Sequence, residues 1–388
     1  MTSRADQFLI VGAGFSGAVM ARELVERLET ARVLVIERKG HIAGNCHTER
    51  DAATGVMVHR YGPHIFNTNN EAVWSYVTRF SVFRPFVNRV KAVTPRGIFS
   101  LPINLLTINQ FFGKAFNPTE ARAFVATLGE ATVDEPRNFE EQALRMMGRD
   151  LYENFFLGYS LKQWGCHPRE LPASILKRLP IRFNYDDNYY DKKHQGIPEH
   201  GYTEIVRAIL DHPRIEVRLE TEFREVDRRP YNHVFYTGPL DAYFDYQYGR
   251  LGYRTVTFER IDADGDYQGN AVINYTAPEV PWTRIHEHKH FAPWEKLEKT
   301  VAFREFSQET GSGDDPYYPK RLEADKRLLS KYRDLAATEK GVTFLGRLAT
   351  YRYMDMEMVI GEALDYAAQW LASPDLHARW PVFPNEES

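Results

Sequence analysis

The sequence predicts an α/β fold in which a helix-flanked parallel sheet is combined with a helical insertion and an antiparallel sheet. Three observations lead to this prediction. The chain opens with an apolar strand, a glycine-containing turn and a helix; helical periodicity dominates between residues 104 and 159; and strands without intervening helices follow residue 250. Alternating strands and helices are typical of parallel sheets, whereas consecutive strands are typical of antiparallel ones.

The first strand, turn and helix have the spacing of a dinucleotide-binding unit. Residues 8–17 read Phe-Leu-Ile-Val-Gly-Ala-Gly-Phe-Ser-Gly, and a helix to residue 28 and a second strand over 32–36 follow. Glu37 ends the second strand, where a carboxylate can bind an adenosine ribose. Because the glycines lie between a strand and a helix, with an acidic residue at the expected distance, the pattern predicts a Rossmann-like domain.

The glycines of this turn have separate physical roles. Gly12 permits the tight turn, Gly14 lets the backbone approach a pyrophosphate, and Gly17 lets the helix pack closely on the strand. Phe15 and Ser16 begin the helix, whose free N–H groups and positive dipole end attract phosphate.

The loop after Glu37 favours FAD as the dinucleotide. Residues 38–45 read Arg-Lys-Gly-His-Ile-Ala-Gly-Asn, where many nicotinamide enzymes continue directly into a helix. The flavoprotein version of this unit carries such a loop along the ribityl and pyrophosphate part of FAD, so Arg38, Gly44 and Asn45 are expected cofactor contacts. The acidic Glu37 also disfavours the 2′-phosphate of NADP.

The remaining elements follow from periodicity and from turn residues. Segments 87–94 and 97–101 alternate across Pro-Arg and predict a β-hairpin. Helices are predicted at 105–112, 118–128, 139–147, 151–163, 201–210 and 356–371. Strands are predicted at 215–219, 234–237, 253–259, 271–275, 283–291, 300–306 and 342–347.

Three domains result. We place the FAD-binding domain at 1–78, 198–242 and 318–388, the helical domain at 103–187 with a mobile lid loop at about 165–181, and the antiparallel sheet domain at 79–102 and 243–317. The proline-containing stretch after residue 165 is long enough to form a lid.

Composition indicates a cytoplasmic protein without a polymeric anion as partner. The net charge is −4, from 49 Lys and Arg against 53 Asp and Glu, so no general attraction to nucleic acid or to an acidic membrane is expected. Cys46 and Cys166 provide no disulfide framework, which fits a reducing compartment. No apolar stretch approaches the roughly twenty residues that span a bilayer.

Eight rarer strings follow the glycine turn in a fixed order. They are Tyr-Gly-Pro-His-Ile-Phe at 61–66, Ser-Leu-Pro-Ile-Asn at 100–104, Tyr-Ser-Leu-Lys-Gln-Trp-Gly at 159–165, Asn-Tyr-Asp-Asp-Asn-Tyr at 184–189, Gly-Asp-Tyr-Gln-Gly at 265–269, Thr-Arg-Ile-His-Glu-His-Lys-His-Phe at 283–291, Pro-Tyr-Tyr-Pro at 316–319 and Tyr-Arg-Tyr-Met-Asp-Met at 351–356. Over essentially the whole chain, this sequence resembles the bacterial UDP-galactopyranose mutases. The resemblance implies FAD as cofactor, a homodimer or higher homo-oligomer, and interconversion of UDP-galactopyranose and UDP-galactofuranose.

The resemblance also implies roles for individual residues in substrate binding. Arg178 and Arg284 match the two arginines that hold the diphosphate. Phe155 matches a residue that stacks on the uracil, Trp164 a substrate contact near the lid, and Asn274 a nucleotide contact. The tyrosines that match donors to the diphosphate or residues lining the sugar site are Tyr159, Tyr189, Tyr318 and Tyr353.

Other matching residues lie near the flavin. Gly62 and His64 belong to a string close to the flavin ring, and a catalytic and a structural role for His64 are both open. Arg347 and the helix that starts at Met356 would stabilise an anionic reduced flavin, with Asp355 as the helix cap.

The implied reaction is not a redox reaction overall. N5 of reduced FAD attacks the anomeric carbon and displaces UDP, and the sugar closes again through a different hydroxyl. The alternative is a FAD-dependent oxidoreductase of the amine-oxidase or protoporphyrinogen-oxidase type, which accounts for the first residues only. A flavin- or nucleotide-sugar-binding sensor is a third reading.

No metal is expected. His286, His288 and His290 alternate, so one strand would place them on one face with Arg284. Neighbours on such a face lie about 7 Å apart, too far for three imidazoles to converge on one ion.

Overall fold

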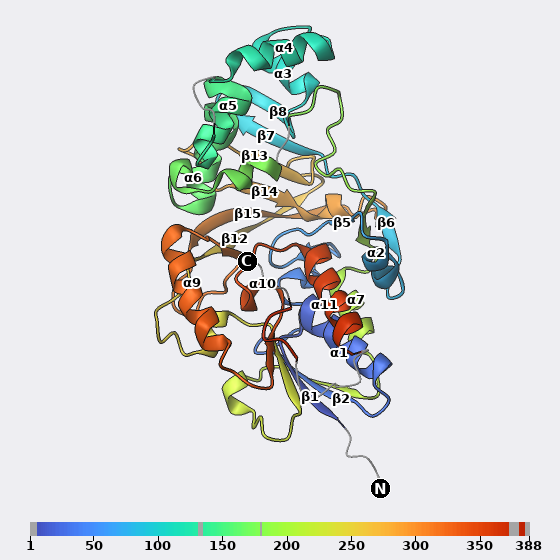
Figure 1. The fold of residues 1–388 in the computed structure, drawn as a ribbon. Helices are drawn as coiled ribbons and strands as arrows, with labels where there is room; N and C mark the ends of the chain where they lie inside the picture. The colour runs from blue at the N-terminus through green and yellow to red at the C-terminus, as the bar shows by residue number, and fades with distance from the viewer. Residues whose placement is uncertain (1–5, 131–134, 179–180, 372–379, 385–388) are drawn as a thin grey trace.

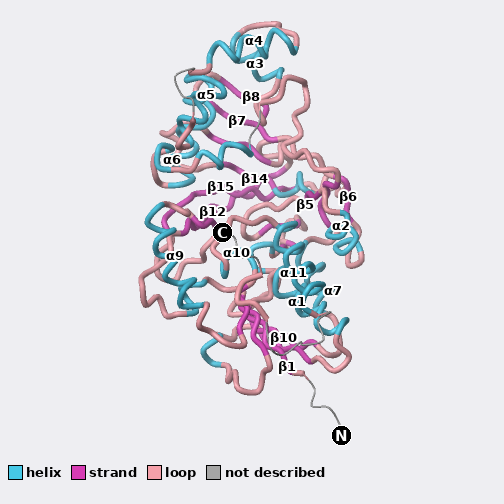
Figure 2. The backbone as a smooth tube through the Cα atoms, viewed as in Figure 1, coloured by secondary structure: helices cyan, strands magenta, loops and turns pink. Residues whose placement is uncertain are grey.

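The computed structural model describes residues 6–130, 135–178, 181–371 and 380–384, and no side chain is described for Lys177, Arg178 or Trp370. The parallel sheet lies at one end, a seven-stranded sheet crosses the middle, and helices α3 to α6 form the other end (Figure 1). Figure 2 shows the strands of the middle sheet between the helical end and the parallel sheet. The predicted fold class is confirmed, while the exact domain boundaries stay a prediction.

The parallel sheet has the strand order of a nucleotide-binding domain. Its strands are, in spatial order, β10 (Ile215–Arg218), β2 (Arg32–Ile36), β1 (Gln7–Val11), β11 (His233–Tyr236) and β17 (Val342–Phe344). All neighbours run parallel. Placing the first strand in the centre creates the crevice at the carboxyl ends where such sheets bind ligands.

Helices cover both faces of this sheet because its strands are apolar on both sides. One face packs under α1 (Phe15–Arg27), α7 (Tyr202–Leu210) and α11 (Met356–Trp370). The other face packs against α8 (Leu240–Tyr243) and α9 (Glu323–Ala336).

The seven-stranded sheet is antiparallel except at one pair. Its strands are, in spatial order, β16 (Tyr318–Pro319), β12 (Tyr253–Asp264), β15 (Lys299–Glu309), β14 (Arg284–Glu287), β13 (Val272–Tyr275), β7 (Val90–Thr94) and β8 (Gly97–Leu101). β13 runs parallel to β7, so the expectation of a purely antiparallel sheet is wrong there. The long connection between β8 and β13 allows this, because a parallel pair requires a long crossover.

Asparagine caps begin three helices of the helical region. The side chains of Asn104, Asn117 and Asn138 accept backbone N–H groups at the starts of α3, α4 and α5. The helices are α3 (Leu105–Phe112), α4 (Pro118–Leu128), α5 (Phe139–Tyr152) and α6 (Gly158–Trp164). The predicted helices 139–147 and 151–163 instead form a continuous path, kinked at Gly148 and joined to α6 by a π-helical turn, Glu153–Leu157.

Two predicted strands end early. β14 stops at Glu287, whose N–H donates to the Ala271 oxygen, and His288–Phe291 then forms a 3₁₀ turn that the alternation of the sequence does not reveal. The strand predicted over 342–347 stops at Phe344, so that Arg347 lies in α10 (Gly346–Ala349). The prediction that three histidines share a strand face with Arg284 is therefore wrong beyond His286.

Smaller elements connect the two large sheets. β3 (Thr48–Arg50) pairs with β4 (Met57–His59), and β9 (His194–Pro198) pairs with both β5 (Phe66–Thr68) and β6 (Phe83–Pro85). Helix α2 (Glu71–Thr78) follows β5. Among the described residues, no helix is long and apolar enough to cross a membrane.

A lysine attaches α6 to the seven-stranded sheet. Lys162 Nζ donates to the main-chain oxygens of four residues in the β13–β14 connection, at 2.7 to 3.0 Å, namely Tyr275, Ala277, Val280 and Trp282. These carbonyls replace the water that the half-buried ammonium has lost. The attachment of α6 to this connection therefore depends on the Lys162 side chain.

We expect Lys162→Met to lower the free energy of unfolding by about 2 to 4 kcal/mol, because four carbonyls lose a charged donor. Urea unfolding measures this change. The control is Lys326→Met on the exposed part of α9, where a change within about 0.5 kcal/mol is expected. Equal effects of the two substitutions would contradict the anchoring role.

Candidate functional site

One large cavity lies between the two sheets. It has a volume of about 2300 Å³ and reaches Val11, Ile36 and Tyr236, the last residues of β1, β2 and β11. The carboxyl ends of parallel strands are the expected position of a ligand in this fold. Residues from α6, β14, β16 and the start of α11 line the rest.

The glycine turn is shaped as the sequence predicts. Gly12 has φ +104°, and a Cβ there would lie 2.1 Å from Thr237 Oγ1. A Cβ on Gly17 would lie 2.0 Å from the Gly12 oxygen, so Gly17 serves packing and does not line the cavity. Gly14, in contrast, has no atom within 4 Å of an added Cβ. Space for a ligand is left at Gly14, beside the N-terminus of α1.

The loop after β2 lies over this turn. The Ala43 N–H donates to the Ala13 oxygen at 2.8 Å, and Glu37 Oε2 accepts the Ala13 N–H at 3.0 Å. Glu37 lines the cavity together with Phe15, Ser16, Arg38, Gly44 and Asn45. These predicted cofactor residues therefore line one wall of the cavity. Cys46 lines it too, and burial raises the pKa of its thiol to about 12.

The start of α11 faces the cavity. Asp355 caps the helix by accepting the Met358 N–H at 3.0 Å, as predicted, and Met356 lines the cavity. Glu357 of the first turn pairs with Lys192 at 2.9 Å. Arg347 reaches the same cavity from α10, so a helix N-terminus and a guanidinium converge there.

A polar row crosses the opposite wall. Asn274, Arg284 and Glu305 stand opposite one another on β13, β14 and β15 and therefore share one sheet face. Arg284 Nε donates to Glu305 Oε2 at 2.9 Å, and the Glu305 side chain is only 1% exposed. Burial opposes the charge of Arg284, but Glu305 outweighs it and holds the pKa of the guanidinium well above its usual range.

Tyrosines surround Arg284. The predicted residues Tyr159, Tyr189, Tyr318 and Tyr353 all line the cavity, as does Trp164. The rings of Tyr318 and Tyr353 stack with centroids 6.0 Å apart. Burial raises the pKa of Tyr318 to about 12 and raises the pKa values of Tyr159 and Tyr189 as well. These hydroxyls therefore remain protonated donors at neutral pH.

Some predicted residues lie elsewhere. Phe155 is 3% exposed, packs against Phe99 and Phe111 and does not line the cavity. Asn274 also lies outside the lining, although its Oδ1 is buried without a partner among the described residues. The side chain of Arg178 lies outside the described residues, and its main chain ends a 3₁₀ turn, Ala173–Arg178.

His64 lines the cavity, near the positive charges of Arg347 and Arg284. Gly62 has φ +90° and lies behind the lining, and its oxygen meets His64 Nδ1 at 2.9 Å. Burial, followed by the charge of Arg347, lowers the pKa of His64 to about 4. Burial lowers the pKa values of His59, His286 and His288 in the same way. We therefore expect all four to be neutral near pH 7.

Beside the 3₁₀ turn His288–Phe291, the side chains of Asp266, Glu287 and His290 form a cluster. Glu287 is fully buried, and its oxygens accept the N–H groups of residues 267, 268 and 269 at 2.7 to 3.0 Å. Lys289 pairs with Asp266 at 2.5 Å. The carboxylates therefore hold the 265–269 loop.

Glu305 is a site residue that the sequence analysis missed. It lies on an apolar alternation with Val301 and Phe303 in β15, and an acidic residue in such a row is the one available signal. Lys192 was missed because it depends on a contact with Glu357, 165 residues away.

Comparisons with known proteins agree with this geometry. A family model described as UDP-galactopyranose mutase matches residues 154–353, and one described as an NAD(P)-binding Rossmann-like domain matches residues 10–80. The chain is 55% identical over 375 residues to a Klebsiella pneumoniae protein named "Probable UDP-galactopyranose mutase", with 97% of each chain covered. It is 48% identical to the dTDP-fucopyranose mutase of Escherichia coli, with 94% of this chain and 98% of that protein covered.

Solved structures show the same fold. A crystal structure of reduced UDP-galactopyranose mutase matches with a TM-score of 0.73 at 14% identity, covering 94% of both chains. A putrescine oxidase with bound putrescine matches with a TM-score of 0.57 at 11% identity, covering 95% of this chain and 99% of that one. At these identities both matches show the fold alone, which mutases and amine oxidases share.

The neutral state of His64 predicts a loss of stability in acid. Between pH 6.5 and 4 the unfolded chain binds a proton at this side chain that the folded chain does not bind, so stability falls as pH drops through this window. Between pH 7 and pH 5, the free energy of unfolding should fall by about 1 to 2 kcal/mol more in the wild type than in His64→Gln.

Urea unfolding at the two pH values, with saturating FAD, measures this difference. The matched control is His200→Gln at an exposed histidine, which should follow the wild type. An identical pH response of His64→Gln and wild type would show that His64 takes up its proton over the same pH range in the folded and unfolded protein, which would contradict the lowered pKa.

Proposed function

The chain belongs to the UDP-galactopyranose mutase family, and we propose that it interconverts UDP-galactopyranose and UDP-galactofuranose with reduced FAD as cofactor. The observation that carries this proposal is the juxtaposition of two anion sites in one cavity. The glycine turn before α1 forms one, and Arg284 with its tyrosines forms the other. A flavin and a nucleotide sugar can therefore meet between the two sheets.

The residues of the first wall fit FAD. Gly14 leaves its surroundings open beside the amides that begin α1, and no side chain of the described residues caps that helix. Glu37 lies where an adenosine ribose is bound in this fold. Arg347 and the start of α11 supply positive potential, which would favour the anionic reduced flavin. Bound here in its reduced form, FAD would supply the nucleophilic nitrogen that the mutase reaction needs.

The second wall fits a diphosphate leaving group. Because Glu305 accepts from Arg284 Nε, the guanidinium is held in one orientation, and its remaining N–H groups can bind phosphate oxygens. The tyrosine hydroxyls stay protonated and can donate as charge develops on UDP. Arg178 would add a second cation from the segment after α6. Neutral His64 can accept or donate one hydrogen bond beside the flavin without adding charge.

The decisive experiment incubates the dithionite-reduced, FAD-loaded protein with UDP-galactofuranose and follows UDP-galactopyranose by chromatography. Conversion by the reduced protein, no conversion by the oxidised protein and no net consumption of reductant would support the proposal. Stoichiometric NADH oxidation would instead indicate the amine-oxidase type of oxidoreductase. Ligand binding without turnover would indicate a sensor.

dTDP-fucopyranose should be assayed in parallel, because the 48% identical relative is named dTDP-fucopyranose mutase. The diphosphate site would accept dTDP-fucopyranose equally well, since both substrates share the nucleoside diphosphate. We propose the UDP-sugar on the basis of the 55% identical relative. A higher kcat/KM for dTDP-fucopyranose than for UDP-galactopyranose would reverse this assignment while leaving the mutase reaction intact.

Arg284→Ala should lower kcat/KM by about a hundredfold or more, because the charge that binds the diphosphate and stabilises its departure is lost. FAD content, read from the flavin absorbance, should not change, since Arg284 lies on the wall opposite the glycine turn. The matched control is Arg304→Ala on β15, whose guanidinium contacts Glu259 and Trp282 outside the cavity. Retained turnover in Arg284→Ala would refute the role of this arginine.

The resemblance supports two further proposals about the whole protein. We propose a homodimer or higher homo-oligomer in the cytoplasm. Light scattering of the purified protein tests the oligomeric state.

A further inference from the structure

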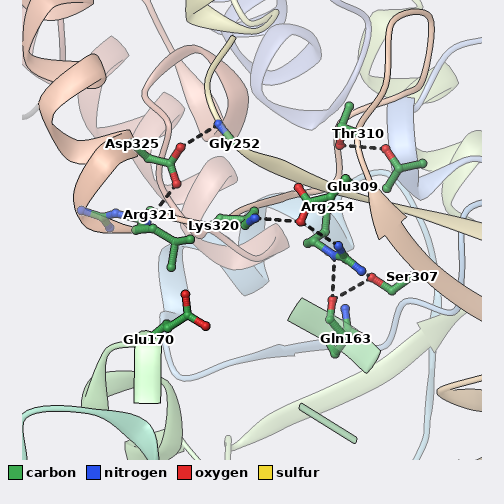
Figure 3. A network of polar contacts seen from close by, with 12 residues as sticks. Gln163, Glu170, Gly252, Arg254, Ser307, Glu309, Thr310, Lys320, Arg321 and Asp325 are labelled. Atoms are coloured by element: carbon green, nitrogen blue, oxygen red, sulfur yellow. Dashed lines mark hydrogen bonds and ion pairs between the residues drawn. The ribbon is translucent and has the colours of Figure 1, made fainter. Parts of the chain in front are cut away.

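A buried arginine lies behind the cavity without lining it. Arg254, on β12, is 3% exposed and is fixed at both its main chain and its side chain. Its main chain pairs with Tyr318 on one side and Glu309 on the other. Its side chain reaches Gln163 at the end of α6 (Figure 3).

The guanidinium satisfies the last carbonyls of α6. Arg254 Nε donates to the Gln163 oxygen at 3.0 Å, and Nη2 donates to the Lys162 oxygen at 3.2 Å. Ser307 Oγ adds a bond to the same Gln163 oxygen at 2.7 Å. The final carbonyls of a helix lack partners within the helix, and a cation there also interacts favourably with the helix dipole.

A carboxylate and a glycine fix the guanidinium in place. Glu309 accepts from Arg254 Nη1 at 3.0 Å and from Lys320 Nζ at 2.7 Å. Gly165, the first residue after α6, has φ +66°, and a Cβ there would lie 2.3 Å from Arg254 Nη1. The exit of the chain from α6 is therefore built around this side chain.

The base of β12 is held independently of the cavity. The Gly252 N–H donates to Asp325 Oδ1 at 2.9 Å, which ties the strand to α9 (Figure 3). Arg254 therefore connects the start of β12, which is held by α9, to the end of α6.

The end of α6 presents two residues to the ligand. Trp164 and Gln163 both line the cavity, and the Oε1 of Gln163 is buried without a hydrogen-bond partner among the described residues. Buried polar atoms of this kind are usually satisfied, so a bound molecule is the natural partner. Tyr318, the ladder partner of Arg254, lines the cavity from the other side.

We infer that Arg254 is a positioning residue that fixes the end of α6 relative to β16, so that Gln163, Trp164 and Tyr318 meet the nucleotide sugar together. This inference rests on the proposed function for the identity of the ligand, UDP. The expected effect of Arg254 on the order of the α6 end does not depend on that function, because this order can be measured without any ligand.

The test compares the FAD-loaded full chain with Arg254→Gln, which keeps a hydrogen-bonding group but loses the fork and the charge. Hydrogen exchange of the 158–166 amides should become roughly tenfold faster, and the Kd for UDP, measured by calorimetry, should rise roughly tenfold or more. Millimolar guanidinium ion should restore the UDP affinity of Arg254→Ala.

Two further variants keep the inference testable if Arg254→Gln folds poorly. Gly165→Ala pushes on the guanidinium from the side of the loop, and it should give the same pair of changes. Arg260→Gln is the control on the same strand, because Arg260 pairs with Asp51 and Asp262 outside the cavity and should leave both measurements unchanged.

Unchanged exchange in both Arg254→Gln and Gly165→Ala would overturn the inference. Faster exchange with an unchanged UDP affinity would also overturn it, since the helix end would then not set the site. Failure of the wild-type protein to bind UDP would contradict the proposed function instead, and the exchange measurement would still decide whether Arg254 orders α6.

Discussion

The ion pair between Arg284 and Glu305 is the interaction on which the site depends. A flavin dinucleotide and a nucleotide sugar each carry two phosphates, so four negative charges would lie in one cavity and repel one another. The two walls of the cavity offer different chemistry for the two pyrophosphates. Main-chain N–H groups at α1 suit one pyrophosphate. Arg284, oriented by a carboxylate that is almost fully buried, suits the other.

Burial is the main reason that the histidines near this arrangement are neutral. Arg284 and Arg347 place two permanent positive charges beside the cavity, and both lower the pKa of His64 after burial itself. A protonated imidazole would add a third charge in a region with little water, where its desolvation would be costly. The main-chain N–H of His64 donates to His59 Nδ1 at 3.3 Å, whereas both ring nitrogens of His286 and Nε2 of His288 are buried without a hydrogen-bond partner among the described residues.

Local signals predicted the elements of the fold well. The glycine turn and the Asp355 cap both act within a few residues, so their pattern is readable in the sequence. The parallel β13–β7 pair was not predictable in the same way, because strand alternation does not report the direction of the neighbouring strand. The 3₁₀ turn His288–Phe291 was missed because its histidines alternate with other residues as they would in a strand.

Long-range charged contacts were the least visible part of the site. Arg254 reads in the sequence as an ordinary strand residue, and its partners Gln163 and Glu309 lie 91 and 55 residues away. The role of Glu305 likewise depends on a residue of another strand, Arg284 on β14. Family resemblance pointed to residues that line the cavity, such as Arg284 and Tyr318, but carried no information about the residues that hold them.

The difference between residues that line the cavity and residues that hold them in place bears on how the protein selects its substrate. Under the proposed function, the part of the cavity formed by Arg284 and the tyrosines would recognise features that UDP-galactopyranose and dTDP-fucopyranose have in common, namely a diphosphate and a pyranose. Discrimination between uracil and thymine, which differ by one methyl group, requires close packing around the base. Phe155 packs tightly against Phe99 and Phe111 in the helical region. Phe155 does not line the cavity, so substitutions that separate base preference from turnover should be sought among the lining residues, whereas changes at Arg284 should weaken both substrates equally.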